Sequence, residues 1–476
     1  MTEIANPLTD DAIARLKAAV GPGGWTDNPD EIAPYLSEDR GLYFGKANLM
    51  MKPANTQEVS AILRICHETG TALVPQGGNT SLVGASIPIT DGDEVILSLR
   101  RLNRIREVDP IANTIVAEAG VILADIQQAA QDVNRLFPLS LGAEGSCRIG
   151  GNLSTNAGGT GVLRYGNARD LALGLEVVLP DGRIIDDLKT LRKDNTGYSL
   201  KNLFIGAEGT LGIITTAALK MFPAPGEVLT AFVAVPHVAA AVDLLSRARS
   251  TVGDSVTAFE LMPRLAIEFL CDHIQGNRDP FENRHDWYVL MEISAPGGEI
   301  KYRPAFEALL ETGFEELVVE DAVIAESDSQ AQALWRLRET LPEAQKPEGA
   351  SIKHDVSVPI TKIPELIAEG QAAIEALIPD VRTLAFGHVG DGNIHFNFSR
   401  PVDWNDESFK ARSSEIHQII HDIVHRHNGS ISAEHGIGRH KREAIKRYKD
   451  PAALQLMRDI KALIDPNGIM NPGKVV

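Results

Sequence analysis

The sequence predicts an α+β protein with two large domains and a closing set of C-terminal helices. Its 476 residues are too many for one ordinary domain, and 43% of them are hydrophobic, which is enough for full cores. Segments with helical and strand periods alternate along the chain, and glycine-rich polar segments interrupt the first half. The predicted divisions are a helical arm at 1–45, a first domain at 46–223, a second domain with an antiparallel sheet at 224–405, and a helical segment at 406–476.

The first 223 residues combine short apolar runs with amphipathic helical patterns. Residues 8–20 predict a helix with acidic residues in its first turn, and residues 56–68 predict another, with Thr56 as its N-cap. Strands are expected at 72–75, 95–99, 104–108, 114–119, 173–179 and 183–185, and a helix at 123–134.

The second half alternates in the same way. Strands are expected at 229–235, 256–261 and 288–293, and helices at 238–250, 360–377 and 413–427. This order is typical of an α+β domain over an antiparallel sheet. On the last helix His417, His421 and His425 recur every four residues, which can mark a metal-binding face. A helix buried on its other side explains the pattern more simply.

Three glycine-rich segments stand out in the first half. Residues 76–84 form a polar loop after a strand, whose backbone N–H groups can wrap a diphosphate, although a plain irregular loop is the alternative. Residues 139–161 hold seven glycines, and ordering them is entropically costly, so close backbone approach to an extended ligand is inferred. Residues 202–215 form the third segment. No Gly-x-Gly-x-x-Gly follows a strand, so a nicotinamide-binding Rossmann domain is unsupported.

The stretch 386–397 has a histidine on each side of a turn made of Gly, Asp, Gly and Asn. These residues tolerate the positive φ values of a tight reversal, so a hairpin is predicted in which His388 ends one strand and His395 opens the next. Side chains alternate along a strand, so His395 and Asn397 should share one face.

A second glycine-rich turn, at 430–438, carries Glu434 and His435. His388, His395 and Glu434 together make a set of two histidines and one carboxylate, which can hold a divalent metal and leave positions for substrate or water. The alternative is that they are ordinary turn and surface residues.

Composition excludes several classes of partner and site. Acidic residues outnumber basic ones, 64 to 46, which argues against binding nucleic acid or an anionic membrane surface. The three cysteines are far apart and form no CxxC motif, so neither a disulfide framework nor a thiolate metal site is indicated. The N-terminus does not have the pattern of a signal peptide, and no run is apolar enough to span a bilayer. A cytoplasmic protein is expected.

Taken in order, these motifs resemble the FAD-linked oxidoreductases of the vanillyl-alcohol-oxidase (PCMH-type) fold. The first half carries Pro75–Thr80, Gly150–Gly159 and Gly206–Gly212. The second half, with Gly387–His395, Ala433–Gly436 and the tail Asp465–Lys474, is similar to the D-2-hydroxy acid dehydrogenases, and within them to the D-2-hydroxyglutarate dehydrogenases.

The resemblance implies FAD in a PCMH-type first domain, and a substrate domain that closes over it. Other branches can carry a flavin-linking histidine in the first loop, where this chain has Asn79, so non-covalent FAD is expected. The residues implied to bind FAD are Pro75, Gln76, Gly77, Gly78, Asn79, Thr80, Gly84, Leu141, Gly145, Ser146, Ile149, Gly150, Gly151, Asn152, Thr155, Asn156, Gly158, Gly159, Gly212 and Ile213.

The resemblance also assigns roles around the hairpin. It implies zinc as the divalent metal on the three ligands given above, and His435 as a substrate contact and catalytic base. The remaining implied substrate contacts are Arg338, Lys353 and Asn397.

The substrate and the electron acceptor stay open at this point. Pro342 stands where D-2-hydroxyglutarate dehydrogenases have a substrate-contacting threonine, while Lys353 supplies a second cation that suits a dicarboxylate. A D-lactate or glycolate dehydrogenase of the same family is the alternative, and a metal-dependent hydrolase is the rival from another class. Electron-transfer flavoprotein or a quinone-linked partner is the implied acceptor, and a homodimer is compatible with the resemblance.

Overall fold

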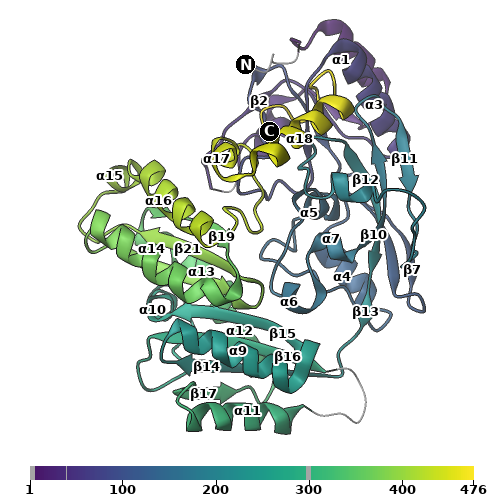
Figure 1. Ribbon diagram of the computed structural model, residues 1–476. Helices are drawn as coiled ribbons and strands as arrows, with labels where there is room; N and C mark the ends of the chain where they lie inside the picture. Colours follow the sequence, from purple (N-terminus) through teal and green to yellow (C-terminus); the bar gives the residue numbers. More distant parts are fainter. Residues whose placement is uncertain (1–5, 39, 296–301) are drawn as a thin grey trace. The chain divides into compact units, whose positions relative to one another are not determined.

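The computed structural model describes residues 6–38, 40–295 and 302–476, and the chain divides into two compact units (Figure 1). Unit 1 comprises the described residues of Met1–Gly158, Gly166–Pro223 and Glu434–Val476. Unit 2 comprises those of Gly159–Tyr165 and Ala224–Ala433. The first five residues of the predicted helical arm, and residue 39 within it, lie outside the described residues. The domain limits expected from the sequence stay predictions.

Unit 1 contains two main sheets. The first has the order β1-β3-β6-β4, in which β3, β6 and β4 run parallel and β1 runs antiparallel. Its strands are β1 (Trp25–Thr26), β3 (Met50–Met51), β6 (Val95–Ser98) and β4 (Leu73–Gln76). The second sheet is antiparallel, and its strands in order are β11 (Ile184–Asp187), β10 (Ala172–Val178), β12 (Ile213–Lys220), β8 (Thr114–Glu118) and β7 (Ile105–Asp109).

Short ribbons and helices complete unit 1. The ribbons pair β2 (Lys46–Ala47) with β5 (Asp91–Gly92), and β9 (Arg135–Leu136) with β13 (Phe222–Pro223). The helices are α1 (Asp10–Ala18), α2 (Pro29–Ile32), α3 (Thr56–Thr69), α4 (Leu123–Gln131), α5 (Ile149–Thr155), α7 (Ala168–Leu171), α8 (Lys201–Phe204), α17 (Arg442–Tyr448) and α18 (Pro451–Ile464).

α3 begins at the predicted residue, Thr56, but its N-cap lies one residue before the predicted one. Asn55 is the N-cap, and its side chain accepts the backbone N–H of Glu58 at 2.9 Å. The predicted cap, Thr56, is wrong because its hydroxyl donates instead to the buried carboxylate of Glu176 at 2.7 Å. The hydroxyl of Thr56 is therefore used in a tertiary contact with Glu176 and does not cap the helix.

The C-terminal tail is part of the first sheet's core. The backbone N–H of Leu73 on β4 donates to the Ile469 carbonyl at 2.9 Å, and that of Asn471 donates to the Leu73 carbonyl at 2.8 Å. Asp465 turns the tail by accepting the N–H groups of Ile469 and Met470. The last residues of the chain thus stabilise the strand that precedes the first glycine-rich loop.

Unit 2 is built on an antiparallel sheet of eight strands. In the order β17-β14-β16-β15-β20-β21-β18, with β19 also paired to β21, they are β17 (Asp321–Ile324), β14 (Glu227–Val235), β16 (Trp287–Ala295), β15 (Val256–Pro263), β20 (Arg382–His388), β21 (Asn393–Ser399), β18 (Ser351–Ile352) and β19 (Asp355–Ser357). The helices of this unit are α6 (Val162–Tyr165), α9 (Val238–Val252), α10 (Arg264–His273), α11 (Arg303–Glu315), α12 (Asp328–Glu339), α13 (Leu341–Ala344), α14 (Ile363–Leu377), α15 (Asp406–Lys410) and α16 (Ser413–Arg426).

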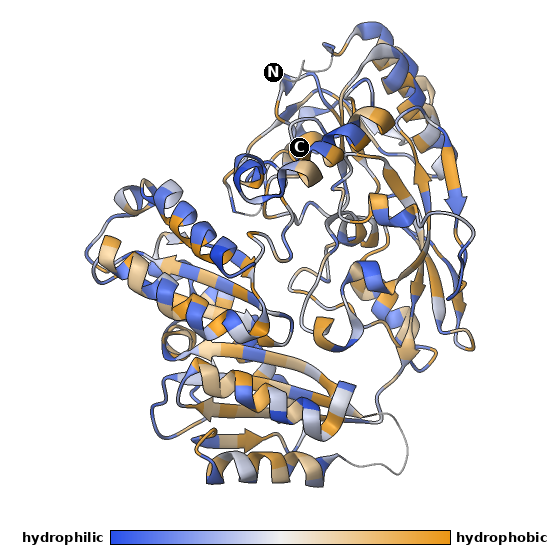
Figure 2. Cartoon of the chain, in the orientation of Figure 1, coloured by the Kyte–Doolittle hydropathy of each residue, from blue (hydrophilic) through white to orange (hydrophobic). Residues whose placement is uncertain are grey.

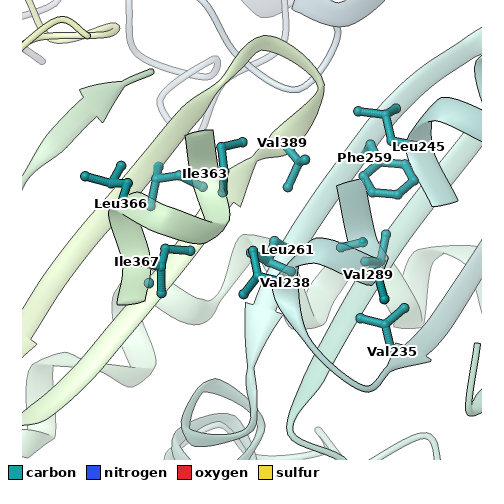
Figure 3. Packing of buried hydrophobic residues seen from close by; sticks show 14 of the residues in the cluster. Val235, Val238, Leu245, Phe259, Leu261, Val289, Ile363, Leu366, Ile367 and Val389 are labelled. Carbon is teal, nitrogen blue, oxygen red and sulfur yellow. The ribbon is translucent and has the colours of Figure 1, made fainter. Parts of the chain in front are cut away.

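Helices cover both faces of this sheet, so both faces of the strands are largely apolar. One face packs on α9, α11, α14 and α16, and Figure 3 shows side chains of β14, β15 and β16 with those of α9 and α14 in one apolar cluster. The other face packs on α10, α12 and α13. The strands are mostly orange in Figure 2, whereas α14 and α16 alternate between orange and blue, as expected of helices with one solvent-facing side.

The predicted hairpin is present as β20 and β21. His388 ends β20, as predicted, but β21 opens at Asn393 rather than at His395. Gly392 has a φ of 86°, and a Cβ there would collide with the Val358 carbonyl, so this turn position requires glycine. The other predicted helices and strands are found close to their predicted limits.

Candidate active site

The three glycine-rich segments meet within unit 1, although they are far apart in the sequence. A Cβ at Gly78 would collide with the carbonyl oxygen of Ser146, and one at Gly209 would collide with Pro75. The backbone N–H of Glu208 donates to the carbonyl of Ser154 at 2.8 Å. Gly78 is needed because two backbones pack directly on each other, and Gly209 because it has a φ of 72° and lies against the ring of Pro75.

The loop after β4 is shaped by two amide side chains. Gln76 Nε2 donates to the carbonyls of Tyr35 at 3.1 Å and Ser86 at 3.0 Å. Asn79 has a φ of 61°, which asparagine tolerates, and its Nδ2 donates to the Ser37 carbonyl at 2.8 Å. These bonds fix the path of the backbone through the first glycine-rich loop.

The same segments fit an extended polar cofactor. Within the described residues, Gln76 Oε1, Arg148 Nε and Asn152 Oδ1 are buried without a hydrogen-bond partner. Buried polar atoms in native proteins are normally paired, so each needs an explanation. Gly145 and Gly151 have no non-neighbouring atom within 4 Å of the place a Cβ would take. A bound group with polar edges would pair these atoms and lie along the bare glycines.

The other positions predicted to bind the cofactor belong to the same segments. In unit 1 they are Pro75, Gly77, Gly78, Thr80, Gly84, Leu141, Ser146, Ile149, Gly150, Thr155, Asn156, Gly158, Gly212 and Ile213. Gly159 falls in the short stretch that belongs to unit 2. The individual contacts of these residues with a cofactor stay predictions.

His435 opens a turn of unit 1 that Glu208 holds in place. The Glu208 carboxylate accepts the two backbone N–H groups of Ile437–Gly438, at 2.7 and 2.9 Å. Just beyond them, the N–H of Arg439 donates to the carbonyl of Val83, in the first glycine-rich loop, at 2.9 Å. The predicted catalytic histidine is thus anchored to the glycine-rich segments of its own unit.

Glu208 should make the stability of the protein depend on pH. Burial raises its pKa to about 7 from 4.5, although the backbone donors and Lys441 oppose this shift. Between these two pH values the folded chain binds more protons than the unfolded chain, so stability falls as pH rises through the window, by up to about 3 kcal/mol. We expect Glu208→Gln to flatten this part of the curve of unfolding free energy against pH, measured with urea. An equally steep curve for the variant would contradict the assignment.

In unit 2, Glu260 joins two of the predicted site residues. It lies on β15, is 1% exposed, and places its carboxylate 2.6 Å from His388 Nδ1 and 2.7 Å from Arg338 Nε. Burial raises the pKa of Glu260, but its close contacts with His388 and Arg338 outweigh burial and lower the pKa to about 2. Glu260 is therefore an anion that orients both side chains.

The orientation of His388 suits a metal ligand. A carboxylate only accepts hydrogen bonds, so Nδ1 of His388 carries the hydrogen and Nε2 is the atom that can bind a metal. A carboxylate that holds a ligating histidine in this way raises its metal affinity. The ring centroid of His395 lies 5.5 Å from that of His388, and each ring offers a nitrogen within 4.8 Å of the other. The two histidines therefore fit a divalent metal.

The polar face of β21 follows the predicted alternation. Phe396, like its apolar neighbours on this strand, points into the core, while His395 and Asn397 lie on the opposite face. Asn397 Nδ2 donates to Gln345 Oε1 at 3.1 Å. On β19, Asp355 pairs with His395 in register, and their side chains approach to 3.9 Å.

The two predicted carboxylate binders can both serve this face. Arg338 is 7% exposed and uses Nε for Glu260, so its terminal amino groups are what it can offer a substrate. Lys353 lies between β18 and β19, two residues before Asp355, which pairs with His395. By strand alternation it belongs to the same face. Pro342 sits in the first turn of α13, where a proline fits a helix start.

Glu434, the third predicted ligand, directly follows Ala433 and begins the last stretch of unit 1. The roles of Glu434 in metal binding, of His435 as a base, and of Arg338, Lys353 and Asn397 toward substrate stay predictions.

Sequence reasoning missed Glu208, Glu260 and Gln345. The usable signal for Glu260 was a lone acidic residue inside an apolar strand, because such a residue is rarely buried unless it is paired. Nothing local marked Gln345, whose amide also donates to Ser399 Oγ at 3.0 Å.

Two family profiles match the chain. One, described as the FAD linked oxidases, C-terminal domain, matches residues 224–475, and one described as an FAD binding domain matches residues 47–187. Among relatives, D-2-hydroxyglutarate dehydrogenase of Arabidopsis thaliana is 40% identical over 91% of this chain and 76% of its own. A putative D-lactate dehydrogenase of Schizosaccharomyces pombe is 38% identical over 94% of this chain and 85% of its own.

Solved structures confirm the predicted fold class. That of p-cresol methylhydroxylase with substrate bound aligns with a TM-score of 0.77 and 16% identity, over 99% of this chain and 98% of its own. At this identity the likeness establishes the α+β, PCMH-type fold alone.

The predicted cytoplasmic location is wrong. The Arabidopsis and Schizosaccharomyces relatives are both named as mitochondrial proteins. Composition was a weak basis for that prediction, because charge and cysteine count do not distinguish one reducing compartment from another. Among the described residues, no helix combines the length and apolarity needed to cross a bilayer.

Proposed function

The chain belongs to the FAD-linked oxidase family, and from this premise we propose that it oxidises a D-2-hydroxy acid, D-2-hydroxyglutarate, to the 2-oxo acid. It is an FAD-dependent oxidoreductase. In the proposal the FAD is non-covalent, because Asn79 stands in the first loop, and its electrons leave to an acceptor such as electron-transfer flavoprotein or a quinone-linked partner.

The observation that carries the choice of substrate is the polar face of the unit 2 sheet. It gathers the histidines of the β20–β21 hairpin, the buried guanidinium of Arg338 and, by alternation, Lys353. A guanidinium can bind a carboxylate through two parallel bonds, and an ammonium can hold a second carboxylate as a point charge. Two cations on one face match a dicarboxylate better than a substrate with a single carboxylate.

We propose that His388, His395 and Glu434 hold a divalent ion, zinc in the first instance. Support comes from Nε2 of His388, which Glu260 leaves for a metal, from the neighbouring His395, and from the carboxylate that follows Ala433 in the chain. Two histidines and one carboxylate are a known open ligand set for zinc. When bound there, such an ion would supply Lewis-acid polarisation of the substrate oxygens, and FAD would supply the hydride acceptor.

The side chains of the protein have separate proposed roles in substrate binding, proton transfer and positioning. Arg338 and Lys353 bind and orient the carboxylates, while Asn397, which Gln345 holds, donates to or accepts from the substrate. His435 takes the proton of the 2-hydroxyl group, as an imidazole can do near neutral pH. Glu208 keeps the turn after His435 in one conformation, so that the base is positioned before substrate arrives.

The test is anaerobic bleaching of the flavin by D-2-hydroxyglutarate, D-malate, D-lactate and their L-enantiomers. We expect fast bleaching by D-2-hydroxyglutarate alone among them, loss of bleaching after chelation, and recovery with zinc. Fast bleaching by L-acids, or by none of the acids, would reject the proposed reaction. Bleaching that survives removal of the metal, verified by elemental analysis, would reject the metal's role and leave the flavin's role standing.

A second candidate substrate is D-lactate. It is favoured by the Schizosaccharomyces relative's name and by Pro342, which cannot supply the hydroxyl that a threonine would offer a distal carboxylate. The two candidates separate in the same experiment through Lys353→Met. This change should raise the concentration of D-2-hydroxyglutarate needed for half-maximal bleaching about tenfold or more, and leave that for D-lactate nearly unchanged.

A further inference from the structure

We propose that His354, His417 and His421 form a second divalent-metal site in unit 2, separate from the histidines of the hairpin. Each of the three offers a ring nitrogen, and these nitrogens all lie within 4.8 Å of one another. The site lies on the other face of the sheet. His354 is two residues from both Ile352 and Val356, so its side chain shares their face, which packs into the core under α14 and α16.

Two ligands come from one helix at a spacing suited to metals. His417 and His421 are four residues apart on α16, so they share one face of the helix. Their ring centroids are 5.8 Å apart and their planes differ by 22°. His354 reaches this face from the segment between β18 and β19, with its centroid 4.6 Å from that of His417 and 5.8 Å from that of His421.

The tautomer of His354 is already set for a metal. Its Nδ1 lies 2.8 Å from the Phe396 carbonyl, which can only accept, so Nδ1 carries the hydrogen and the lone pair is on Nε2. That Nε2 lies 2.9 Å from Nδ1 of His417, inside the cluster. A backbone carbonyl that holds the far nitrogen of a histidine is a common support of ligating imidazoles.

The distances need little change to accept an ion. Nitrogens bound to a tetrahedral zinc at about 2.0–2.1 Å are about 3.3 Å apart, so a small ring movement opens the His354–His417 pair around it. His354 and His421 are 3% and 7% exposed, and His417 is half-buried, which leaves a side for entry and for a fourth ligand such as water. Neutral imidazole nitrogens are the commonest metal ligands among protein side chains.

The site would clamp the sheet edge to α16. His354 directly follows Lys353 and precedes Asp355, so an ion on its ring would also fix the segment that carries the proposed substrate lysine. A purely hydrogen-bonded histidine cluster is the competing explanation, and it predicts no bound metal.

Metal content of the purified flavin-loaded protein decides between them. After dialysis against metal-free buffer and reloading with zinc, elemental analysis of the wild type should find about two ions per chain. His421→Ala and the milder His417→Gln should each lose about one, while His425→Ala, an exposed histidine on the same helix, should lose none. Flavin content and the far-ultraviolet circular dichroism spectrum confirm that each variant is folded.

The variant His395→Ala removes a proposed ligand of the hairpin site, so that metal binding by the second site can be measured by itself. In it, added zinc should still raise the melting temperature, and the further change His417→Gln should abolish that rise. Wild-type metal content in both folded cluster variants would overturn the proposal, whatever the His395→Ala variant does. If the His417 and His421 variants lose metal and His425→Ala does not, the second site is supported, even if the hairpin site holds no ion.

Discussion

Replacing His435 with alanine will slow reduction of the flavin by the D-2-hydroxy acid about 10²- to 10⁴-fold, the usual contribution of a positioned general base. The reason is that the variant lacks the imidazole proposed to take the proton of the 2-hydroxyl group as the hydride leaves. Binding should change much less, because Arg338 and Lys353, which are proposed to hold the carboxylates, are unchanged. Stopped-flow spectroscopy of flavin bleaching under saturating substrate measures the rate.

The control for this variant is His440→Ala. His440 lies further along the same stretch of unit 1, is exposed, and contacts Tyr43 Oη through its Nδ1 at 2.8 Å. It should bleach at close to the wild-type rate. If His435→Ala also kept the wild-type rate at saturating substrate, His435 would not be the base.

The second large effect is expected at Glu260. Glu260→Gln keeps the shape of the side chain but removes the charge that orients His388, so the affinity for the proposed metal of the hairpin site should fall about 10- to 100-fold. Glu260→Ala should in addition cost about 3–5 kcal/mol of unfolding free energy, because the guanidinium of Arg338 is then left buried without its counter-ion. Competition with a chelator measures the metal affinity, and urea denaturation measures the stability.

Glu292 offers a matched control on the neighbouring strand β16. It is partly buried, and its carboxylate accepts a hydrogen bond from Trp335 Nε1 at 2.8 Å, whereas the carboxylate beside His388 is that of Glu260. Glu292→Gln should therefore leave metal affinity unchanged. Equal losses of metal affinity in the two glutamine variants would mean that the effect comes from general loosening of the sheet, and the assignment of Glu260 would fail.

Many features of the fold and the candidate site were predicted from local sequence patterns. Hydrophobic periods placed the main helices and strands near their observed limits, and the glycine–aspartate turn predicted the hairpin that carries His388. Alternation along β21 correctly set His395 and Asn397 on one face. The resemblance of the glycine-rich segments, taken in order, to those of a known family indicated the PCMH-type fold and an FAD-dependent oxidoreductase.

Only the tertiary structure determined which side chains these residues contact. Glu260 lies beside His388 because β15 pairs with β20, strands more than a hundred residues apart, and the order of strands in a sheet is not encoded in their periodicity. Long-range contacts also explain why the hydroxyl of Thr56, predicted to cap α3, donates to Glu176 instead, and why His354 lies beside the histidines of α16. The sequence by itself determined which elements form and which chemistry they carry. Long-range pairing determined which carboxylate orients which histidine, because burial makes a charge depend on neighbours that only folding brings together.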